Sequence, residues 1–137
     1  MAHFAKIGRI GRTVVQVVVV NNDVLKDDEG TEQESLGQQF LKDLYNDQEA
    51  VWLQTSYNGN FRNVYATVGS TYDNVNDEFI NKRPAGYESW RWNRATKQYD
   101  PPVAKPETTN ASGVLEVYKW NEGTYSWIKM PSLTPPE

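Results

Sequence analysis

Few side chains in this sequence have the type and spacing that a chemical reaction requires. The chain holds 137 residues, with a single histidine, His3, and no cysteine. A catalytic triad or a facial metal site needs partner groups at fixed positions, so we interpret His3 as decoration of the surface or of an edge strand. Without cysteine the chain has no disulfide, no thiolate metal ligand and no cysteine nucleophile. The sequence therefore predicts no enzyme activity, no catalytic residue and no cofactor.

Two acidic stretches contain oxygen atoms that could bind a cation. Asp27-Asp28-Glu29 lies in an acidic loop, and Asp73–Asp77 offers carboxylate and amide oxygens. Oxygen-rich turns suit calcium, but neither stretch has the spacing of a known calcium loop. A catalytic acid and base need two carboxyl groups at a fixed separation in a cleft, whereas adjacent acids on a loop are typical of a solvated surface. We therefore expect no metal site, and bound calcium stays open as the alternative.

The segment Gly8-Arg-Ile-Gly11 resembles a dinucleotide-binding loop. The residues after it, Thr13–Val20, are a β-branched run typical of a strand. A pyrophosphate site needs a helix N-terminus at that point. The segment is therefore predicted to be a plain hairpin turn.

The charges are distributed unevenly along the chain. The net charge of −4 argues against a general affinity for nucleic acid. Residues 21–49 carry nine acidic and two basic residues, a net charge of −7, whereas residues 82–97 carry five basic and one acidic residue, a net charge of +4. Because complementary patches fix the register of an interface, this asymmetry favours packing against copies of the chain or against other proteins.

The basic segment also carries aromatic side chains, and aromatic residues and arginine are enriched at protein interfaces. Such a strip can stack single-stranded bases, but the acidic chain as a whole makes nucleic acid the weaker interpretation. Exposed tryptophan and tyrosine can also stack on sugar rings, so a glycan is the alternative ligand. The candidate interface residues are Trp90, Arg91, Trp92, Arg94, Tyr118, Trp120, Tyr125 and Trp127.

A short pattern recurs three times. It consists of an aromatic residue, an Asp or Asn, five further residues and a second aromatic residue, at Tyr72–Phe79, Trp92–Tyr99 and Trp120–Trp127. Asp and Asn start turns by bonding their own backbone, and aromatic residues that face each other across two strands stabilise a hairpin. We therefore predict three β-hairpins with an aromatic residue at each foot.

Further strands are predicted near the N-terminus. Val14–Val20 is apolar on both faces apart from Gln16. A strand of that kind is buried on both sides or lies in the middle of a sheet, so we expect it to be the core strand. Residues 3–7 and 51–55 predict two further strands.

The sequence predicts one amphipathic helix at about residues 32–46. Thr31 and Glu34 have the spacing of a capping box at its start. The apolar residues fall on one helical face, and we expect Phe40 and Leu44 to pack on the sheet. Gly37 lowers the helix propensity, which indicates a close approach to another element.

These elements indicate an α+β, β-dominated fold, with an antiparallel sheet built from hairpins and one helix. Prolines at 101, 102 and 106 stop β-pairing. We therefore expect a β-rich domain at 1–100, a proline-rich linker at 101–113, and a hairpin with an extended C-terminal arm at 114–137. Because an isolated hairpin is marginal in water, the third hairpin is expected to be buried against another chain.

The sequence also resembles a known family. Met1–Ala5, the valine-rich strand that ends in Asn21-Asn22-Asp23, and the block Trp52–Arg62 begin a series that continues along the chain. It continues with Tyr65-Ala66, Gly69, Tyr72-Asp73, Phe79-Ile80, Pro84, Ser89-Trp90 and the prolines from Pro101 to Pro106. Over residues 1–106 the chain resembles small proteins of tailed bacteriophages of aquatic bacteria, cyanophages among them. It departs from them in two ways: the proline-dense stretch that follows Ile80 is thinned to Pro84, and the chain continues past Pro106 into an added hairpin and tail.

The resemblance implies a phage-encoded, minor component of the virion and supplies no catalytic residues. We expect a structural protein that acts through protein–protein contacts, either as a capsid decoration (cement) protein or as an accessory of the neck, tail or baseplate. Its partners would be other virion proteins, such as the major capsid or tail and neck proteins, and copies of itself. The alternative is a glycan-binding module that aids host attachment.

The expected location is the virion, after synthesis in the host cytoplasm. The N-terminus lacks the charged and then apolar layout of a signal peptide. The longest apolar run, Val17–Val20, is too short to cross a bilayer, so we expect no membrane partner.

Overall fold

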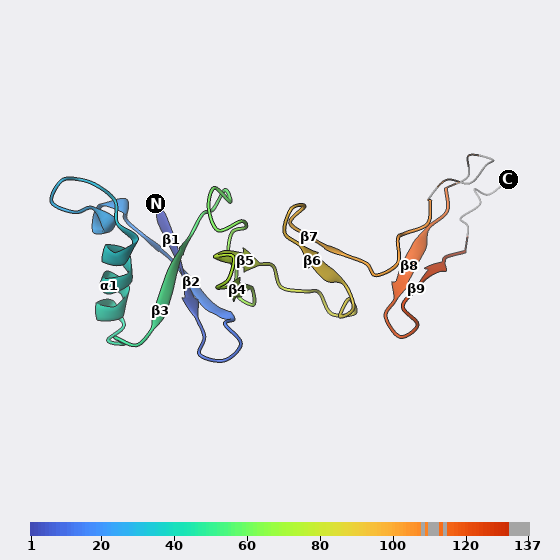
Figure 1. The fold of residues 1–137 in the computed structure, drawn as a ribbon, viewed down its shortest axis with the longest axis horizontal. Coiled ribbons are helices and arrows are strands. Elements are labelled where there is room, and N and C mark those ends of the chain that lie inside the picture. The colour runs from blue at the N-terminus through green and yellow to red at the C-terminus, as the bar shows by residue number, and fades with distance from the viewer. Residues whose placement is uncertain (108, 110–112, 114, 132–137) are drawn as a thin grey trace. The chain divides into compact units, whose positions relative to one another are not determined.

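The computed structural model describes residues 1–107, 109, 113 and 115–131 (Figure 1). The chain divides into two compact units, Met1–Lys82 and Arg83–Glu137, which we call the N-terminal and C-terminal units. The N-terminal unit contains β1 (Ala2–Ile7), β2 (Val14–Val20), a 3-10 helix (Asn22–Leu25), α1 (Glu34–Leu44), β3 (Val51–Thr55), β4 (Thr71–Asp73) and β5 (Glu78–Ile80). The C-terminal unit contains β6 (Arg91–Asn93), β7 (Gln98–Asp100), β8 (Tyr118–Asn121) and β9 (Ser126–Lys129). The predicted α+β, β-dominated class is confirmed.

β1 is the central strand of the only three-stranded sheet in the described part of the chain, and the order is β2-β1-β3 with antiparallel pairing throughout. The prediction that Val14–Val20 forms the core strand is therefore wrong. Val15 and Val19 are exposed, whereas Phe4 and Ala5 of β1 are fully buried. A β-branched run predicts that a strand forms but does not fix its place in the sheet.

Helix α1 lies beside the three-stranded sheet (Figure 1), and its side chains pack against Phe4 of β1. The contact is made through Gly37 and Leu41, both buried. The predicted contacts through Phe40 and Leu44 are wrong, because these side chains are 39% and 61% exposed. The close approach at Gly37 is confirmed: the Phe4 ring occupies the space that a Cβ would fill. The buried face of the helix therefore contains Gly37 and Leu41, and Phe40 and Leu44 lie outside it.

The predicted capping box is also wrong. The N-cap residue of α1 is Gln33, whose side chain caps no backbone group of the helix in the described structure. Glu34 is instead the first helical residue, and its carboxylate accepts the backbone N–H of Gln54 in β3 at 2.9 Å. The Glu34 side chain, which the sequence pattern assigned to the capping box with Thr31, thus bonds to β3 instead.

All three predicted hairpins form with the predicted aromatic residues opposite each other. The pairs Tyr72–Phe79, Trp92–Tyr99 and Trp120–Trp127 are in register, with ring centroids 5.6, 5.1 and 5.3 Å apart. The hairpins share one turn geometry, in which the Asp73, Asn93 or Asn121 side chain accepts backbone N–H groups of its own turn. The residue five places after the first aromatic has a positive φ in each, at Asp77 (53°), Lys97 (59°) and Tyr125 (51°).

The units divide the chain earlier than the sequence predicted. The expected boundary lay near residue 100, whereas the second hairpin belongs with the third in the C-terminal unit. The segment expected to be a linker also makes contacts, because Trp127 Nε1 donates to the backbone oxygen of Val103 at 2.8 Å. Apart from Pro131, the extended arm expected at 131–137 lies outside the described residues.

Gly37→Ala tests the packing of α1. The added Cβ would lie 2.8 Å from Phe4 Cε2 and closer still to Cζ. Overpacking of this kind costs about 1–3 kcal/mol, more than the gain of up to about 1 kcal/mol in helix propensity. Urea unfolding should therefore show a less stable protein. Ser35→Ala, at an exposed position of the same helix, should leave the stability unchanged or slightly raised; a more stable Gly37→Ala protein would contradict the packing.

Candidate functional site

The densest polar cluster of the N-terminal unit surrounds Arg62. Its Nη1 donates to Glu34 Oε1 and to the backbone oxygen of Gln54 at 2.9 Å, and its Nε donates to Asp77 Oδ1 at 2.8 Å. Tyr72 Oη donates to the same Asp77 oxygen at 2.6 Å. Only 15% of the Arg62 side chain is exposed. The cluster therefore ties α1, β3 and the β4–β5 hairpin together through one guanidinium group.

The electrostatics of this cluster stabilise the charged forms of Asp77 and Arg62. The hydrogen bonds from Tyr72 and Arg62 hold the pKa of Asp77 below its usual value. Burial and then the bond to Asp77 raise the pKa of Tyr72 to about 12, so its hydroxyl stays protonated at neutral pH. Burial lowers the pKa of Arg62, but Glu34 and Asp77 more than offset this and raise it. We interpret the cluster as a structural clamp.

In both acidic stretches, a carboxylate accepts hydrogen bonds from backbone N–H groups of its own loop. Asp27 Oδ1 accepts the N–H groups of Glu29 and Thr31, each at 2.9 Å, and the bond from Thr31 is the main cause of its lowered pKa. Asp73 accepts N–H groups within the first hairpin turn. In the part of the chain that the structure describes, no three His, Cys, Asp or Glu side chains gather as a metal site would require.

His3 lies on the central strand and not on an edge strand, which corrects the prediction. Its ring stacks on Tyr57 with centroids 5.8 Å apart and meets Tyr65 edge-on at 5.5 Å. β1 is central because both β2 and β3 pair with it. His3 is half-buried in an aromatic cluster.

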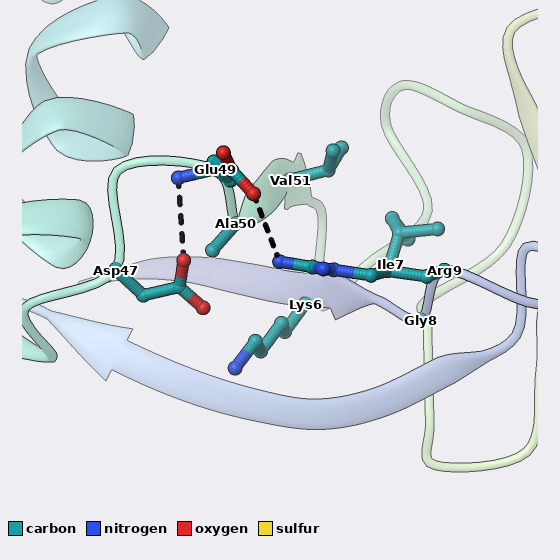
Figure 2. Close-up of a pocket in the computed structure, with 8 residues that line it drawn as sticks. All are labelled: Lys6, Ile7, Gly8, Arg9, Asp47, Glu49, Ala50 and Val51. Carbon is teal, nitrogen blue, oxygen red and sulfur yellow. Dashed lines mark hydrogen bonds and ion pairs between the residues drawn. The ribbon is translucent and has the colours of Figure 1, made fainter.

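A small hollow of about 220 Å³ lies at the end of β1, and its lining includes Lys6, Arg9, Asp47 and Glu49. Figure 2 shows Arg9 reaching Glu49, at 3.2 Å, while Asp47 Oδ1 accepts the Glu49 N–H. The side chains of this ion pair are largely exposed, and exposed pairs contribute about 0–1 kcal/mol. Within this hollow, Arg9 and Glu49 already neutralise each other.

Aromatic rings form the centre of the C-terminal unit. Trp90 meets Tyr87, Trp120 and Trp127 edge-on, with centroids 4.9, 5.8 and 5.9 Å apart. The Trp90 indole N–H is buried and has no hydrogen-bond partner among the described residues. Ring contacts therefore fix this side chain.

Glu122 joins the third hairpin to the segment before β6. Its carboxylate accepts the backbone N–H of Ser89, the Ser89 hydroxyl at 2.8 Å and the Trp120 indole N–H at 3.0 Å. Burial raises the pKa of Glu122, but the bonds from Trp120 and Ser89 outweigh it and lower the pKa overall. Trp120 is buried in this way by its own chain, whereas burial of this hairpin against another chain stays a prediction.

The predicted interface residues divide between the inside and the rim of this unit. Trp90, Arg91 and Tyr125 line one open hollow of about 510 Å³, together with Arg83, Glu88, Ser89 and Pro102. Trp92 pairs with Tyr99. Trp120 is buried and Trp127 is half-buried. The Tyr118 hydroxyl donates to Glu116, and Arg94 lies in the β6–β7 turn. Their role in an interface stays a prediction.

Sequence reasoning missed four residues of this hollow, Arg83, Glu88, Ser89 and Pro102. Arg83 belongs to the basic segment at 82–97, so its charge was a usable signal. Pro102 was assigned to a linker, and only the fold brings it beside Trp90.

The chain was also compared with known proteins. No model of a known protein family matches it, and neither a curated protein nor a solved structure matches at a significant level. Within the described residues, no helix has the length and apolar character that crossing a membrane requires.

Arg62→Met tests the clamp. It leaves two carboxylates without their cation, and breaking a partly buried pair of this kind should lower the unfolding free energy by about 2–4 kcal/mol. Arg9→Met removes an exposed arginine–glutamate pair and should change it by less than about 0.5 kcal/mol. Equal effects of the two substitutions would contradict the clamp.

The difference in unfolding free energy between the parent chain and Arg62→Met should depend on pH in a defined direction. Asp77 has a folded pKa below its ordinary 3.8, so its contribution is complete above that pH and is lost as the pH falls further and the carboxylate is protonated. The stability difference between the parent chain and Arg62→Met should narrow in that acidic range.

Trp90 offers a test of the ring cluster. Trp90→Ala should destabilise the C-terminal unit by about 2–4 kcal/mol, because three rings lose their contact. Trp90→Phe keeps an aromatic ring and removes the unpaired indole donor, so it should retain most of the stability. Near-ultraviolet circular dichroism and urea unfolding measure both; equal losses would show that ring packing does not fix this unit.

Proposed function

We propose that this chain is a non-enzymatic structural component of a phage particle that acts through protein–protein contacts. The contact surface is the hollow lined by Trp90, Arg91 and Tyr125 in the C-terminal unit, with Arg83 and Pro102 beside them. Tryptophan, tyrosine and arginine are the residues that dominate binding energy at protein interfaces. The lining holds two arginines and one acidic residue, Glu88, and this excess of positive charge suits an acidic segment of the partner.

Tyr125 is the observation that carries this proposal. Its backbone has a φ of 51°, a left-handed conformation that costs an ordinary residue about 1–2 kcal/mol and that Gly or Asn adopts more readily. The side chain is nevertheless large, aromatic and 60% exposed. A similar φ occurs in the other two hairpin turns, so what distinguishes Tyr125 is its large, exposed aromatic ring at the hollow. A partner that covers this ring would account for it.

The phage setting rests on the resemblance over residues 1–106. It supports a virion location, on the capsid as a decoration protein or at the neck, tail or baseplate as an accessory. The third hairpin lies beyond the resemblance, so the contact made by Tyr125 would be particular to this chain. The partner would be a major capsid, tail or neck protein.

The glycan alternative has less support. Sugar stacking needs a free aromatic face, whereas three rings already contact Trp90 and Tyr99 contacts Trp92. Among the candidate interface residues, Tyr125 is the aromatic side chain that is exposed.

Tyr125→Asn separates folding from function. It relieves the left-handed strain, so the melting temperature should rise, corresponding to about 1 kcal/mol, while loading of the protein onto phage particles should fall. Lys97→Asn is the matched control, because Lys97 has a φ of 59° at the equivalent turn position; it should stabilise the protein and load normally.

The measurement is mass spectrometry of purified particles of the encoding phage, with loading quantified for each variant. A glycan array run beside it distinguishes the alternative. Absence of the protein from particles, or full loading of Tyr125→Asn, contradicts the proposal.

A further inference from the structure

The outer edge of β2 is open over most of its length. At its start, Val14 N donates to Ser70 O at 2.7 Å, and Arg12 and Val14 oxygens accept from Tyr72 and Gly69. From Val15 to Val20, no backbone hydrogen bond forms on this side among the described residues. Native proteins usually protect such an edge with charge, proline or a covering element, yet β2 contains neither a charged residue nor proline.

The other edge of the sheet is closed. In β3, the Gln54 N–H donates to Glu34 and the Gln54 oxygen accepts from Arg62. The Trp52 oxygen accepts from Gln38 of α1 at 2.7 Å. Side chains thus occupy backbone groups of β3, and β2 is the edge left for another strand.

An apolar hollow of about 330 Å³ lies along the open edge, between β2 and α1. Its lining includes Val18, Val20, Phe40 and Leu44. Phe40 and Leu44 are the helix residues that the sheet does not cover. An unpaired strand edge and an uncovered apolar row therefore face the same space.

A second copy of the chain fits this surface. The open stretch is centred on Val18, so antiparallel pairing of two β2 strands about Val18 uses the free edge of each and avoids the paired segment at Arg12–Val14. The strand carries no charge, so like charges do not oppose each other. The charged residues that flank the strand have partners within their own copy, since Arg12 donates to Asn74 and Asp23 pairs with Lys26, so they do not oppose the pairing.

We propose that two copies of this chain associate through their β2 edges about a two-fold axis. The pairing joins two three-stranded sheets into one of six strands. The apolar rows of the two α1 helices then lie on the same face on either side of the axis, as an isologous interface requires. This surface belongs to the N-terminal unit, and it stands whether or not the proposed function of the C-terminal unit is correct.

Val19→Lys and Val51→Lys form a matched pair of tests. Val19 is 52% exposed on the β2 edge and Val51 is 51% exposed on the β3 edge. Sedimentation velocity over a wide concentration range should show a monomer–dimer equilibrium for the full chain. Val19→Lys should weaken the dimer at least about tenfold, since a lysine at the edge opposes pairing, and Val51→Lys should leave it unchanged.

The register is tested by cross-linking, which the cysteine-free chain permits. Val18→Cys places the two thiols opposite each other, so mild oxidation should give a disulfide-linked dimer, whereas Val51→Cys should not. A chain that stays monomeric throughout and does not cross-link at position 18 overturns the proposal. So does a dimer that Val19→Lys leaves intact.

Discussion

The structure depends on one repeated interaction, the pair of aromatic rings that face each other across an Asx-capped turn. Each two-stranded ladder contributes only three or four residues per strand, and hairpins of that size are marginal in water alone. Every copy must therefore pack on a larger body. The first is held by the Arg62 clamp, with Phe79 fully buried. The segment just before the second hairpin meets the third through Trp90 and through the bond from Ser89 to Glu122, and both hairpins belong to the C-terminal unit.

One turn position serves three purposes in the three copies. The left-handed residue after the Asx cap is Asp77, Lys97 or Tyr125. Asp77 receives hydrogen bonds from Arg62 and Tyr72, so it contributes to the fold. Lys97 lies in solvent, and Tyr125 lies at the rim of a hollow. The same scaffold thus provides a clamp, an exposed turn and a displayed ring, which is why we place function in the third copy.

The local features were predictable from the sequence and the long-range ones were not. Aromatic spacing and the Asp or Asn beside it fixed the hairpin registers, because both signals act within eight residues. The helix was predicted for the same reason. Its buried face was not, because that face depends on Gly37 meeting Phe4, which lies 33 positions earlier in the chain.

The order of the strands in the sheet could not be predicted from the sequence either, because it also depends on long-range contacts. β2 has the stronger strand sequence, but β1 is central because both neighbours pair with it. Arg62 looked like an ordinary surface arginine, since its partners come from α1 and from the β4–β5 hairpin. Within the candidate site, Trp90, Arg91 and Tyr125 were predicted from residue type, whereas Pro102 joined them only through the fold.

Amide hydrogen exchange of the full chain tests the central claim most directly, that each hairpin is stable only through the body it packs on. The account predicts two cooperative groups: β4 and β5 exchange with the free energy of β1–β3, and β6 and β7 exchange with that of β8 and β9. The contrary result is rapid exchange of β8 and β9 while β6 and β7 stay protected, or exchange of β6 and β7 together with the N-terminal unit.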